Sequence, residues 1–336
     1  MTEKKILLAH GSGGKLSHDL IREVFLAHFD NKFLRKLTDS AVFNHKGTGW
    51  AFTTDSYVIR PLFFPGGDIG KLAVSGTIND LAVMGAKPIF LSCALIIEEG
   101  LSLSILKKII SSMRETAEGA GVQIITGDTK VVEHGSADGL FINTSGIGLM
   151  PAEGKNPPCE IKVEDKVIIN GTIGDHSIAT LSWREEFDFH TQVKSDCAPL
   201  NDLIGNVLDQ SSGVKLMRDP TRGGIATILN EMAMGEEFGI ELWEEKIPFK
   251  EETLAISEML GFDPLYLANE GKVVFIVEAN QAQKILKLLQ SHPLGKESKI
   301  IGRVVAEPKG KLYLRTSIGT RRVLDMLSGD QLPRIC

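Results

Sequence analysis

The chain has 336 residues, of which 43% are hydrophobic and 24% are charged, the balance of a globular protein with a sizeable core. Its length is enough for about two domains of ordinary size. The net charge of −6, without a clustered basic stripe, argues against a general nucleic-acid surface.

Targeting signals and metal-binding cysteine pairs are also missing from the sequence. The longest apolar stretch, at 89–97, is far shorter than the ~20 residues of a membrane-spanning helix. The apolar run near the N-terminus is too short for the core of a signal peptide. The four cysteines form no CxxC pair, which argues against a structural zinc site. We therefore expect a protein that works away from membranes, in the reducing cytoplasm.

Strands and helices alternate along the first half of the chain. Residues 49–59 alternate and are rich in β-branched side chains, which predicts a strand. The apolar residues of 68–86 fall at helical spacing, and Gly85 supplies a stop. Residues 102–121 predict an amphipathic helix with Ser102 as its N-cap. Further strands are expected at 87–97, 122–132 and 139–150.

Strands and helices also occur along the second half of the chain. It follows a segment rich in proline and charged residues, which predicts a domain boundary near 151–160. Helices are expected at 175–186, 222–234 and 280–291, and strands at 166–172, 239–245, 272–278 and 298–306. Glycine and proline punctuate 318–336, where we expect a loose tail. The chain is thus predicted to consist of domains at 1–150 and 151–325, each an α/β or α+β unit, and a tail at 326–336.

Acidic side chains stand beside turns at the ends of several predicted elements. They are Asp55, Asp68, Asp80, Asp128, Asp219 and Glu270. Carboxylates in glycine-flanked positions are good ligands for Mg²⁺, which usually joins one or two carboxylates to phosphates. Since an aspartate before a glycine is also ordinary turn chemistry, both interpretations stay open for each residue.

Two glycine-rich stretches, at 10–17 and 65–72, have the composition of loops that expose backbone N–H groups to phosphate. Neither is a P-loop, because the second spaces its glycines by three residues and lacks the hydroxyl residue after its lysine. A simple turn is the alternative for both. The sequence DPTRGG is more specific, because Asp219 precedes a helix predicted to begin near Arg222, and the N-terminus of a helix favours anions.

Lys130 and Glu270 are the candidate pair for proton transfer. Lys130 follows a Gly-Asp-Thr turn and would direct a cation at whatever Asp128 helps to bind. A solvated surface lysine is the simpler interpretation of this residue. Glu270, between an asparagine and a glycine, is equally compatible with a turn.

The last residue, Cys336, is a thiol at the end of the sequence QLPRIC. A free cysteine has a pKa near ~8.5 and reacts as its thiolate, which the nearby cation Arg334 favours. Prenylation is excluded, because a CaaX motif needs three residues after its cysteine. A thiol on a loose arm is suited to carrying a covalent group between two sites, and an incidental terminal residue is the alternative.

Several segments of this sequence closely resemble those of one protein family. The HypE hydrogenase maturation proteins have sequences similar to TTDSYVIRPLFFPGGDIGKLAVSGTINDLAVMGAKP, TGDTKVV, MRDPTRGGIATILNE, DPLYLANEGK and the terminal PRIC. The resemblance runs from HGSGGK to Cys336 and so covers essentially the whole chain. HypE proteins belong to a superfamily of ATP-using enzymes with aminoimidazole ribonucleotide (AIR) synthase, selenophosphate synthetase and thiamine-monophosphate kinase. The long first block indicates the superfamily, and the C-terminal cysteine indicates the family.

The resemblance implies a two-domain α/β (α+β) fold like that of AIR synthase. The N-terminal domains of a homodimer would form a β-barrel together. ATP with Mg²⁺ would bind in the cleft between this barrel and the C-terminal α/β domain, and a flexible tail would carry Cys336.

The resemblance also implies a reaction. A partner carbamoyltransferase, HypF, would load a carbamoyl group onto Cys336. ATP would then drive dehydration of the thiocarbamate to a thiocyanate. The cyano group would pass to the HypC–HypD complex and become a cyanide ligand on the iron of a [NiFe]-hydrogenase.

By the same resemblance, each candidate residue has an implied role. The metal and triphosphate roles would fall on Asp55, Asp80, Asp128 and Asp219, with Asp68 in support. Glu270 would act as the base, and Lys130 would stabilise the developing charge.

Two other classes of function stay open. A small-molecule kinase or synthetase of the same superfamily would use the same aspartates without needing the tail. A non-catalytic scaffold for metallocentre assembly would bind partners without hydrolysing ATP, and the clustered acidic and glycine-rich positions weigh against it.

Overall fold

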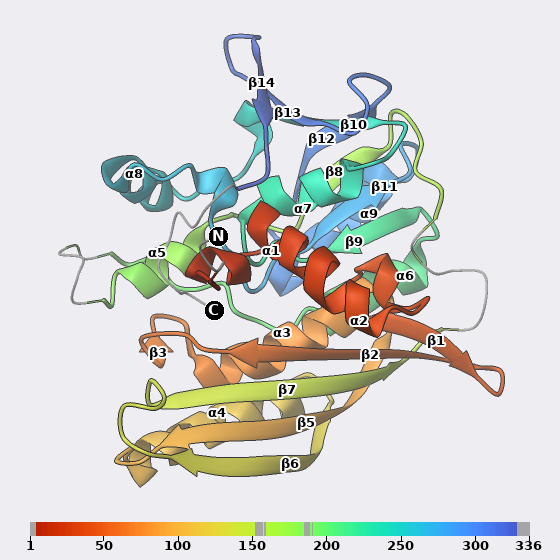
Figure 1. Cartoon of the computed structure of the whole chain (residues 1–336). Coiled ribbons are helices and arrows are strands. Elements are labelled where there is room, and N and C mark those ends of the chain that lie inside the picture. The colour runs from red at the N-terminus through yellow and green to blue at the C-terminus, as the bar shows by residue number, and fades with distance from the viewer. Residues whose placement is uncertain (1–4, 152–156, 158, 185–188, 190, 328–336) are drawn as a thin grey trace.

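The computed structural model describes residues 5–327, except 152–156, 158, 185–188 and 190. Each half of this part of the chain builds one β-sheet, and helix α3 (Ile69–Val83) lies between the two sheets (Figure 1). This mixture of helices and strands in two units agrees with the expected fold class.

The first sheet is formed by β1 (Ala41–His45), β2 (Thr48–Tyr57), β5 (Lys87–Glu98), β6 (Gln123–Val132) and β7 (Leu140–Leu149). Its strand order is β1–β2–β7–β5–β6, so that β6 is an edge strand. Neighbouring strands are antiparallel except β5 and β6, which are parallel. A short hairpin of β3 (Phe63–Phe64) and β4 (Gly67–Asp68) leads into α3.

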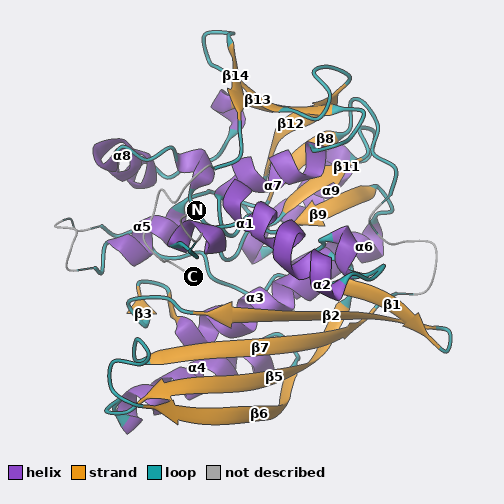
Figure 2. Cartoon of the chain, viewed as in Figure 1, coloured by secondary structure: helices purple, strands orange, loops and turns teal. Residues whose placement is uncertain are grey.

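Helices α3 and α4 (Leu103–Gly119) pack together and cover one face of this sheet, as Figure 2 shows. The N-terminal segment contains η1 (Leu8–Gly11), α1 (Lys15–Leu20), η2 (Ile21–Leu26), α2 (Ala27–Phe29) and η3 (Leu34–Lys36). It crosses to the second half of the chain, where His18 Nε2 on α1 lies 2.9 Å from Glu231 Oε1.

The second sheet is formed by β8 (Lys166–Ile169), β9 (Val214–Arg218), β10 (Gly239–Trp243), β11 (Val274–Val277), β12 (Lys299–Val305), β13 (Leu312–Arg315) and β14 (Arg321–Leu324). Its order is β14–β13–β10–β12–β8–β11–β9. Only β10 and β13 are parallel neighbours.

Helices flank the second sheet, and three of them contribute to the two largest hydrophobic clusters of this half. The helices are α5 (Asp175–Leu181), α6 (Asn201–Gln210), α7 (Gly224–Ala233), α8 (Glu251–Leu260) and α9 (Ala282–Gln290), with short turns η4 (Glu244–Lys246), η5 (Pro264–Tyr266) and η6 (Pro293–Gly295). Helix α7 packs into one cluster with β10 and β13. Helices α6 and α9 pack into the other, which also takes in Ala82 and Val83 from the end of α3.

The predicted strands and helices all exist, but several boundaries and one segment were wrong. The helix expected at 175–186 ends at Leu181, and the helix expected from Arg222 begins at Gly224. The segment expected to be a loose tail from residue 318 contains β14, which pairs with β13. Its glycine, Gly319, adopts a φ of 85° and closes this hairpin, so the glycine marks a turn and not the start of a tail. Residues 328–336, including Cys336, lie outside the described residues.

Helix α3 begins at an aspartate that caps its N-terminus. Asp68 Oδ1 accepts hydrogen bonds from the backbone N–H groups of Gly70 and Lys71, at 2.7 and 3.1 Å. These donors have no partner inside the helix, and a carboxylate at this end also favours the helix dipole. The structure therefore gives Asp68 a structural role at the start of the helix.

We predict that Asp68→Ala lowers the free energy of unfolding by about 1–2 kcal/mol, because the two N–H groups lose their acceptor. Asp68→Asn keeps an oxygen acceptor and should cost less. Urea unfolding measures both variants, with nucleotide affinity measured by calorimetry alongside. A loss of nucleotide affinity without a loss of stability would instead support the supporting triphosphate role suggested by the sequence.

Candidate active site

A pocket opens between the two halves of the chain. Its walls come from β2, from α3, from the segment that follows β9 and from the segment before β11. The lining residues are Asp55, Ser56, Tyr57, Gly76, Asp80, Asp219, Thr221, Arg222 and Glu270. The fold thus brings Asp55, Asp80, Asp219 and Glu270 together from four distant places in the sequence.

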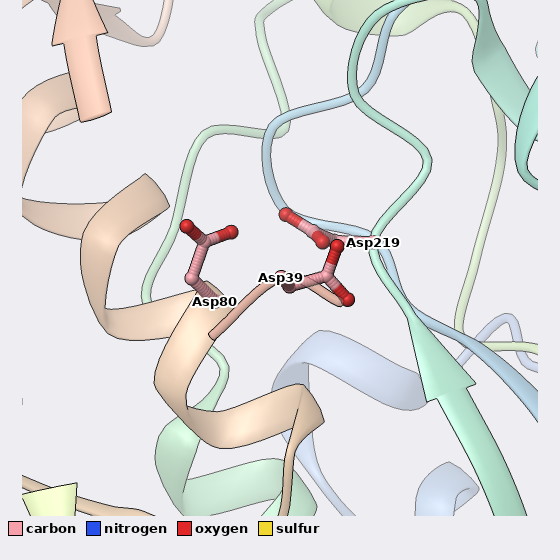
Figure 3. Close-up of side chains that lie close together, drawn as sticks. All are labelled: Asp39, Asp80 and Asp219. Atoms are coloured by element: carbon pink, nitrogen blue, oxygen red, sulfur yellow. The ribbon is translucent and has the colours of Figure 1, made fainter. Parts of the chain in front are cut away.

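Three carboxylates form a tight cluster at this pocket. Oxygen atoms of Asp39, Asp80 and Asp219 all lie within 4.8 Å of one another. Figure 3 shows that they come from three different elements: Asp80 projects from α3, Asp39 from the segment before β1, and Asp219 from the segment after β9. Such a set of oxygen donors is suited to a hard divalent cation.

Neighbouring side chains hold this cluster in place. The Thr53 hydroxyl lies 2.8 Å from Asp80 Oδ2 and 2.8 Å from the carbonyl oxygen of Asp39. Arg218 Nε lies 3.1 Å from Asp39 Oδ2, and its Nη2 donates to Glu231 at 2.8 Å. Asp39 Oδ2 and Arg218 Nε are poorly aligned, so within the described residues this buried oxygen accepts no hydrogen bond. A buried carboxylate oxygen that accepts no hydrogen bond is suited to binding a metal ion.

Burial, and then the like charges of the cluster, raise the pKa values of its carboxyl groups. Burial raises the pKa of Asp219 to about 8, and the charges of Asp39 and Asp55 add to the effect. Burial also raises the pKa of Asp80 well above its usual value, with further contributions from Asp219, Asp55 and Asp39. The pKa of Asp39 is raised by burial, although Arg218 opposes the shift. A divalent cation would remove this repulsion, so the residues present fit Mg²⁺.

Glu270 is held rigidly by its backbone at the edge of the pocket. Its N–H donates to Asp196 Oδ1 at 3.1 Å, and its carbonyl oxygen accepts from the Asn79 side chain at 3.4 Å. A β-carbon on Gly271 would collide with the carbonyl oxygen of Asp196, so the neighbouring residue must be small. Burial raises the pKa of Glu270 well above its usual value, and the charges of Asp196, Asp219 and Asp55 add to it. A carboxylate with a raised pKa is a stronger base once it is ionised.

The structure does not bring Asp128 and Lys130 to this pocket within one chain. Both lie on β6, and Lys130 Nζ donates to the two carboxylate oxygens of Asp128 at 2.9 and 2.7 Å. Both side chains are exposed, and the hydrogen bond from Lys130 holds the pKa of Asp128 below its usual value. Strand β6 is separated from β2 by β5 and β7, which places it about 14 Å across the sheet at ~4.8 Å per strand.

Several residues at the site were not predicted from the sequence. Asp39 is one, although a signal for it exists: the tripeptide Thr-Asp-Ser occurs at both 38–40 and 54–56. Tyr57 is another, a buried side chain whose hydroxyl has no hydrogen-bond partner among the described residues. It packs directly on Gly76, where any β-carbon would collide with the hydroxyl oxygen.

Comparison with known proteins shows the family to which the chain belongs. The family model described as AIR synthase related protein, N-terminal domain, matches residues 37–150, and the corresponding C-terminal domain model matches 162–315. The carbamoyl dehydratase HypE of Cupriavidus necator is 47% identical over 333 residues, covering 99% of this chain and 95% of the relative. The chain belongs to the HypE family.

Solved HypE structures resemble the whole chain. A crystal structure of a HypE–HypF complex contains a chain that is 48% identical, with a TM-score of 0.86, covering 92% of this chain and 99% of the other. A crystal structure of HypE in complex with ATP is 43% identical, with a TM-score of 0.82, covering 99% of this chain and 100% of the other. The two-domain AIR-synthase-like fold is therefore established for this member of the HypE family. Among the described helices, none combines the length and apolar character of a membrane span.

We predict that the cation-free chain becomes less stable as the pH rises between about 4 and 8, because folded Asp219 (pKa about 8 against an ordinary 3.8) keeps a proton that the unfolded chain has lost. Asp219→Asn should flatten this slope, by up to about 1.4 kcal/mol per pH unit. Urea unfolding in the presence of a chelator measures it.

The matched control for this prediction is Asp128→Asn. Since the pKa of Asp128 is lowered by Lys130, its removal should leave the slope above pH 4 unchanged. The explanation is wrong if the Asp219→Asn chain keeps the slope of the original protein.

Proposed function

We propose that this chain is an ATP-dependent carbamoyl dehydratase that acts on its own C-terminal cysteine. A carbamoyl group on Cys336 is dehydrated to a thiocyanate, which supplies the cyanide ligand for the iron of a [NiFe]-hydrogenase. The observation that carries this proposal is the pocket in which the carboxylate cluster and Glu270 meet, in a chain 47% identical to a carbamoyl dehydratase over nearly its whole length.

The partners follow from the same proposal. HypF loads the carbamoyl group, consistent with a related HypE chain that crystallised with HypF. The HypC–HypD complex accepts the cyano group. All of these steps belong in the reducing cytoplasm, where a free thiol on Cys336 persists.

ATP makes the dehydration possible by converting the amide oxygen into a leaving group. Transfer of the γ-phosphoryl group to the thiocarbamate oxygen gives ADP. Loss of phosphate from carbon and of two protons from nitrogen then leaves S–C≡N. The overall balance is thiocarbamate plus ATP to thiocyanate, ADP, hydrogen phosphate and one proton. Mg²⁺, when bound, offsets the charge of the triphosphate.

The residues of the pocket divide these tasks. Asp39, Asp80 and Asp219 would hold Mg²⁺, and Asp55 lines the same pocket from β2. Glu270 accepts a proton from the carboxamide nitrogen. Because the pKa of Glu270 is raised, the ionised base accumulates only as the pH increases, and turnover should rise with pH through that raised pKa.

Asp128 and Lys130 join the site from the partner subunit of a homodimer in this proposal. Every residue of β6 except Val132 is exposed, and none of the strands in the described part of the chain pairs with its outer edge. Apolar side chains are also exposed on this sheet, among them Phe52 (47%) and Ile125 (59%). An uncovered edge with apolar neighbours is typical of a surface that pairs with another chain. Pairing of two copies here would build the barrel and carry Lys130 to the other chain's pocket.

We predict that Cys336→Ala abolishes cyanide-ligand formation and leaves ATP affinity within about twofold, since the thiol carries the substrate but does not build the pocket. Mass spectrometry of the C-terminal peptide after incubation with HypF, carbamoyl phosphate and ATP should show a gain of one carbamoyl group and then a loss of one water. Cys159→Ala, at an exposed cysteine, is the matched control and should behave like the original protein.

Two results would contradict this prediction. A carbamoyl label on Cys93, Cys159 or Cys197 would show that the carrier is a different thiol. Full ATP-dependent activity on a free small molecule after deletion of the last six residues would favour a kinase or synthetase instead.

The homodimer is tested by mixing two inactive variants. Chains with Lys130→Ala and chains with Glu270→Gln should each lose at least about 100-fold in turnover. If the two residues of one site come from different chains, random mixed dimers restore one site in half of the dimers, about a quarter of all sites. No recovery on mixing, in dimers shown to exchange subunits, would mean that both residues act within one chain or that Lys130 is only a surface residue.

A further inference from the structure

Three hydrogen bonds hold the chain where it leaves β14. The carbonyl oxygen of Leu324 accepts from the Asn230 side chain at 2.8 Å, and that of Asp325 accepts from the Tyr266 hydroxyl at 2.7 Å. The carbonyl oxygen of Leu327 accepts from the backbone N–H of Lys15 at 3.0 Å. The last described residues before the tail are therefore attached to α7, to η5 and to the start of α1.

The glycines before α1 allow the chain to pass at close range. A β-carbon on Gly14 would collide with the carbonyl oxygen of Leu327, and one on Gly13 would lie 3.2 Å from Cβ of Arg222. The N-terminal glycine segment thus lies between the base of the tail and a residue that lines the pocket. The short helix η1 ends there too, at Gly11, whose carbonyl oxygen accepts from Arg222 Nη1 at 2.8 Å.

Arg222 connects this arrangement to the carboxylates of the pocket. Its Nη2 lies 3.8 Å from Asp55 Oδ1, and its side chain is partly exposed. One arginine is therefore in contact with the glycine segment on one side and with the pocket on the other. The base of the tail is held at the rim of the pocket and not at a remote point of the molecule.

We propose that Gly13, Gly14 and Lys15 form a tail clasp, which fixes the point from which the C-terminal tail reaches the pocket. The proposal rests on the function proposed above and assigns positioning residues to it. Cys336 is the ninth residue after Leu327, so at ~3.3–3.6 Å per residue its backbone lies at most about 32 Å from the clasp. Fixing the start of so short an arm at the rim raises the effective concentration of the thiocarbamate at ATP.

This proposal gives the glycine-rich stretch at 10–17 a role in holding the base of the tail. The sequence had suggested a phosphate-binding loop there instead. Gly14 is buried with φ −84° and ψ −165°, a conformation open to any residue. Its lack of a side chain is needed for the close approach of Leu327 and not for backbone freedom.

The Lys15 N–H can be removed without damage to its helix. Lys15 is the first residue of α1, where an N–H has no helical partner and proline is favoured. The extended conformation of Gly14 also suits a residue before proline. Lys15→Pro therefore deletes the bond to Leu327, whereas Lys15→Ala keeps the N–H and removes only the side chain. Gly14→Ala displaces Leu327 directly, and Gly11→Ala, with nothing within 4 Å, is its matched control.

The decisive measurement is single-turnover dehydration of the carbamoylated full-length chain at saturating ATP, followed by mass spectrometry. We expect the rate constant to fall about tenfold in Lys15→Pro relative to Lys15→Ala, and about tenfold in Gly14→Ala relative to Gly11→Ala. The ATP concentration for half-saturation should stay within about twofold. Amide hydrogen exchange at Lys15 should be faster in Gly14→Ala than in Gly11→Ala.

A reaction in trans separates positioning from a general structural role. With Cys336→Ala added to each variant, a synthetic QLPRIC peptide carbamoylated on its cysteine serves as the substrate. The clasp variants should convert saturating peptide as fast as their controls, because a free peptide does not depend on where the tail begins. An equal loss with the peptide would mean that the variants damage the pocket itself, and the clasp would be rejected.

The remaining outcomes distinguish the two proposals. If the original chain dehydrates its own tail and the clasp variants match their controls, the clasp is wrong and the proposed function stands. If the original chain does not dehydrate its tail at all, the proposed function fails, and the positioning role fails with it.

Discussion

The burial of α3 is the constraint on which the rest of the structure depends. Of its 15 residues, 13 are buried, and the helix is apolar on nearly every side. Such a helix is stable only when other elements cover all of its faces. The first sheet and α4 cover one side, while α6 and β9 of the second half cover another. Because both halves need the same helix, they are fixed relative to each other, and the pocket between them is fixed too.

The two incompletely buried residues of α3 are Lys71 and Asp80. Asp80 reaches the carboxylate cluster, while its buried neighbour Asn79 bonds to the segments at Ala198, Leu200 and Glu270. A single turn of helix therefore supplies one carboxylate of the cluster and holds the backbone of the candidate base. Bringing several carboxylates into a buried space is unfavourable by itself, as their raised pKa values show. A fold that accepts this repulsion without a cation is built to bind one.

Much of the architecture could be predicted from local patterns in the sequence. The N-cap at Ser102 and the alternation in 49–59 were correct, because capping and periodicity depend on residues close together along the chain. The strand β14 was missed, because a short edge strand depends on a partner strand more than on its own composition. Asp39 was missed for a related reason: its role depends on Asp80 and Asp219, which lie far from it in sequence.

By itself the sequence determined the family, the alternation of strands and helices, and the set of acidic residues. The tertiary structure decided which of these residues meet. It joined Asp80, Asp219 and Glu270 at one pocket, made Asp68 a helix cap, and left Lys130 on an exposed edge strand. It also brought the glycines near the N-terminus against Leu327, near the other end of the chain. The physical reason is that distances between remote segments are set by packing around α3, which no local pattern records.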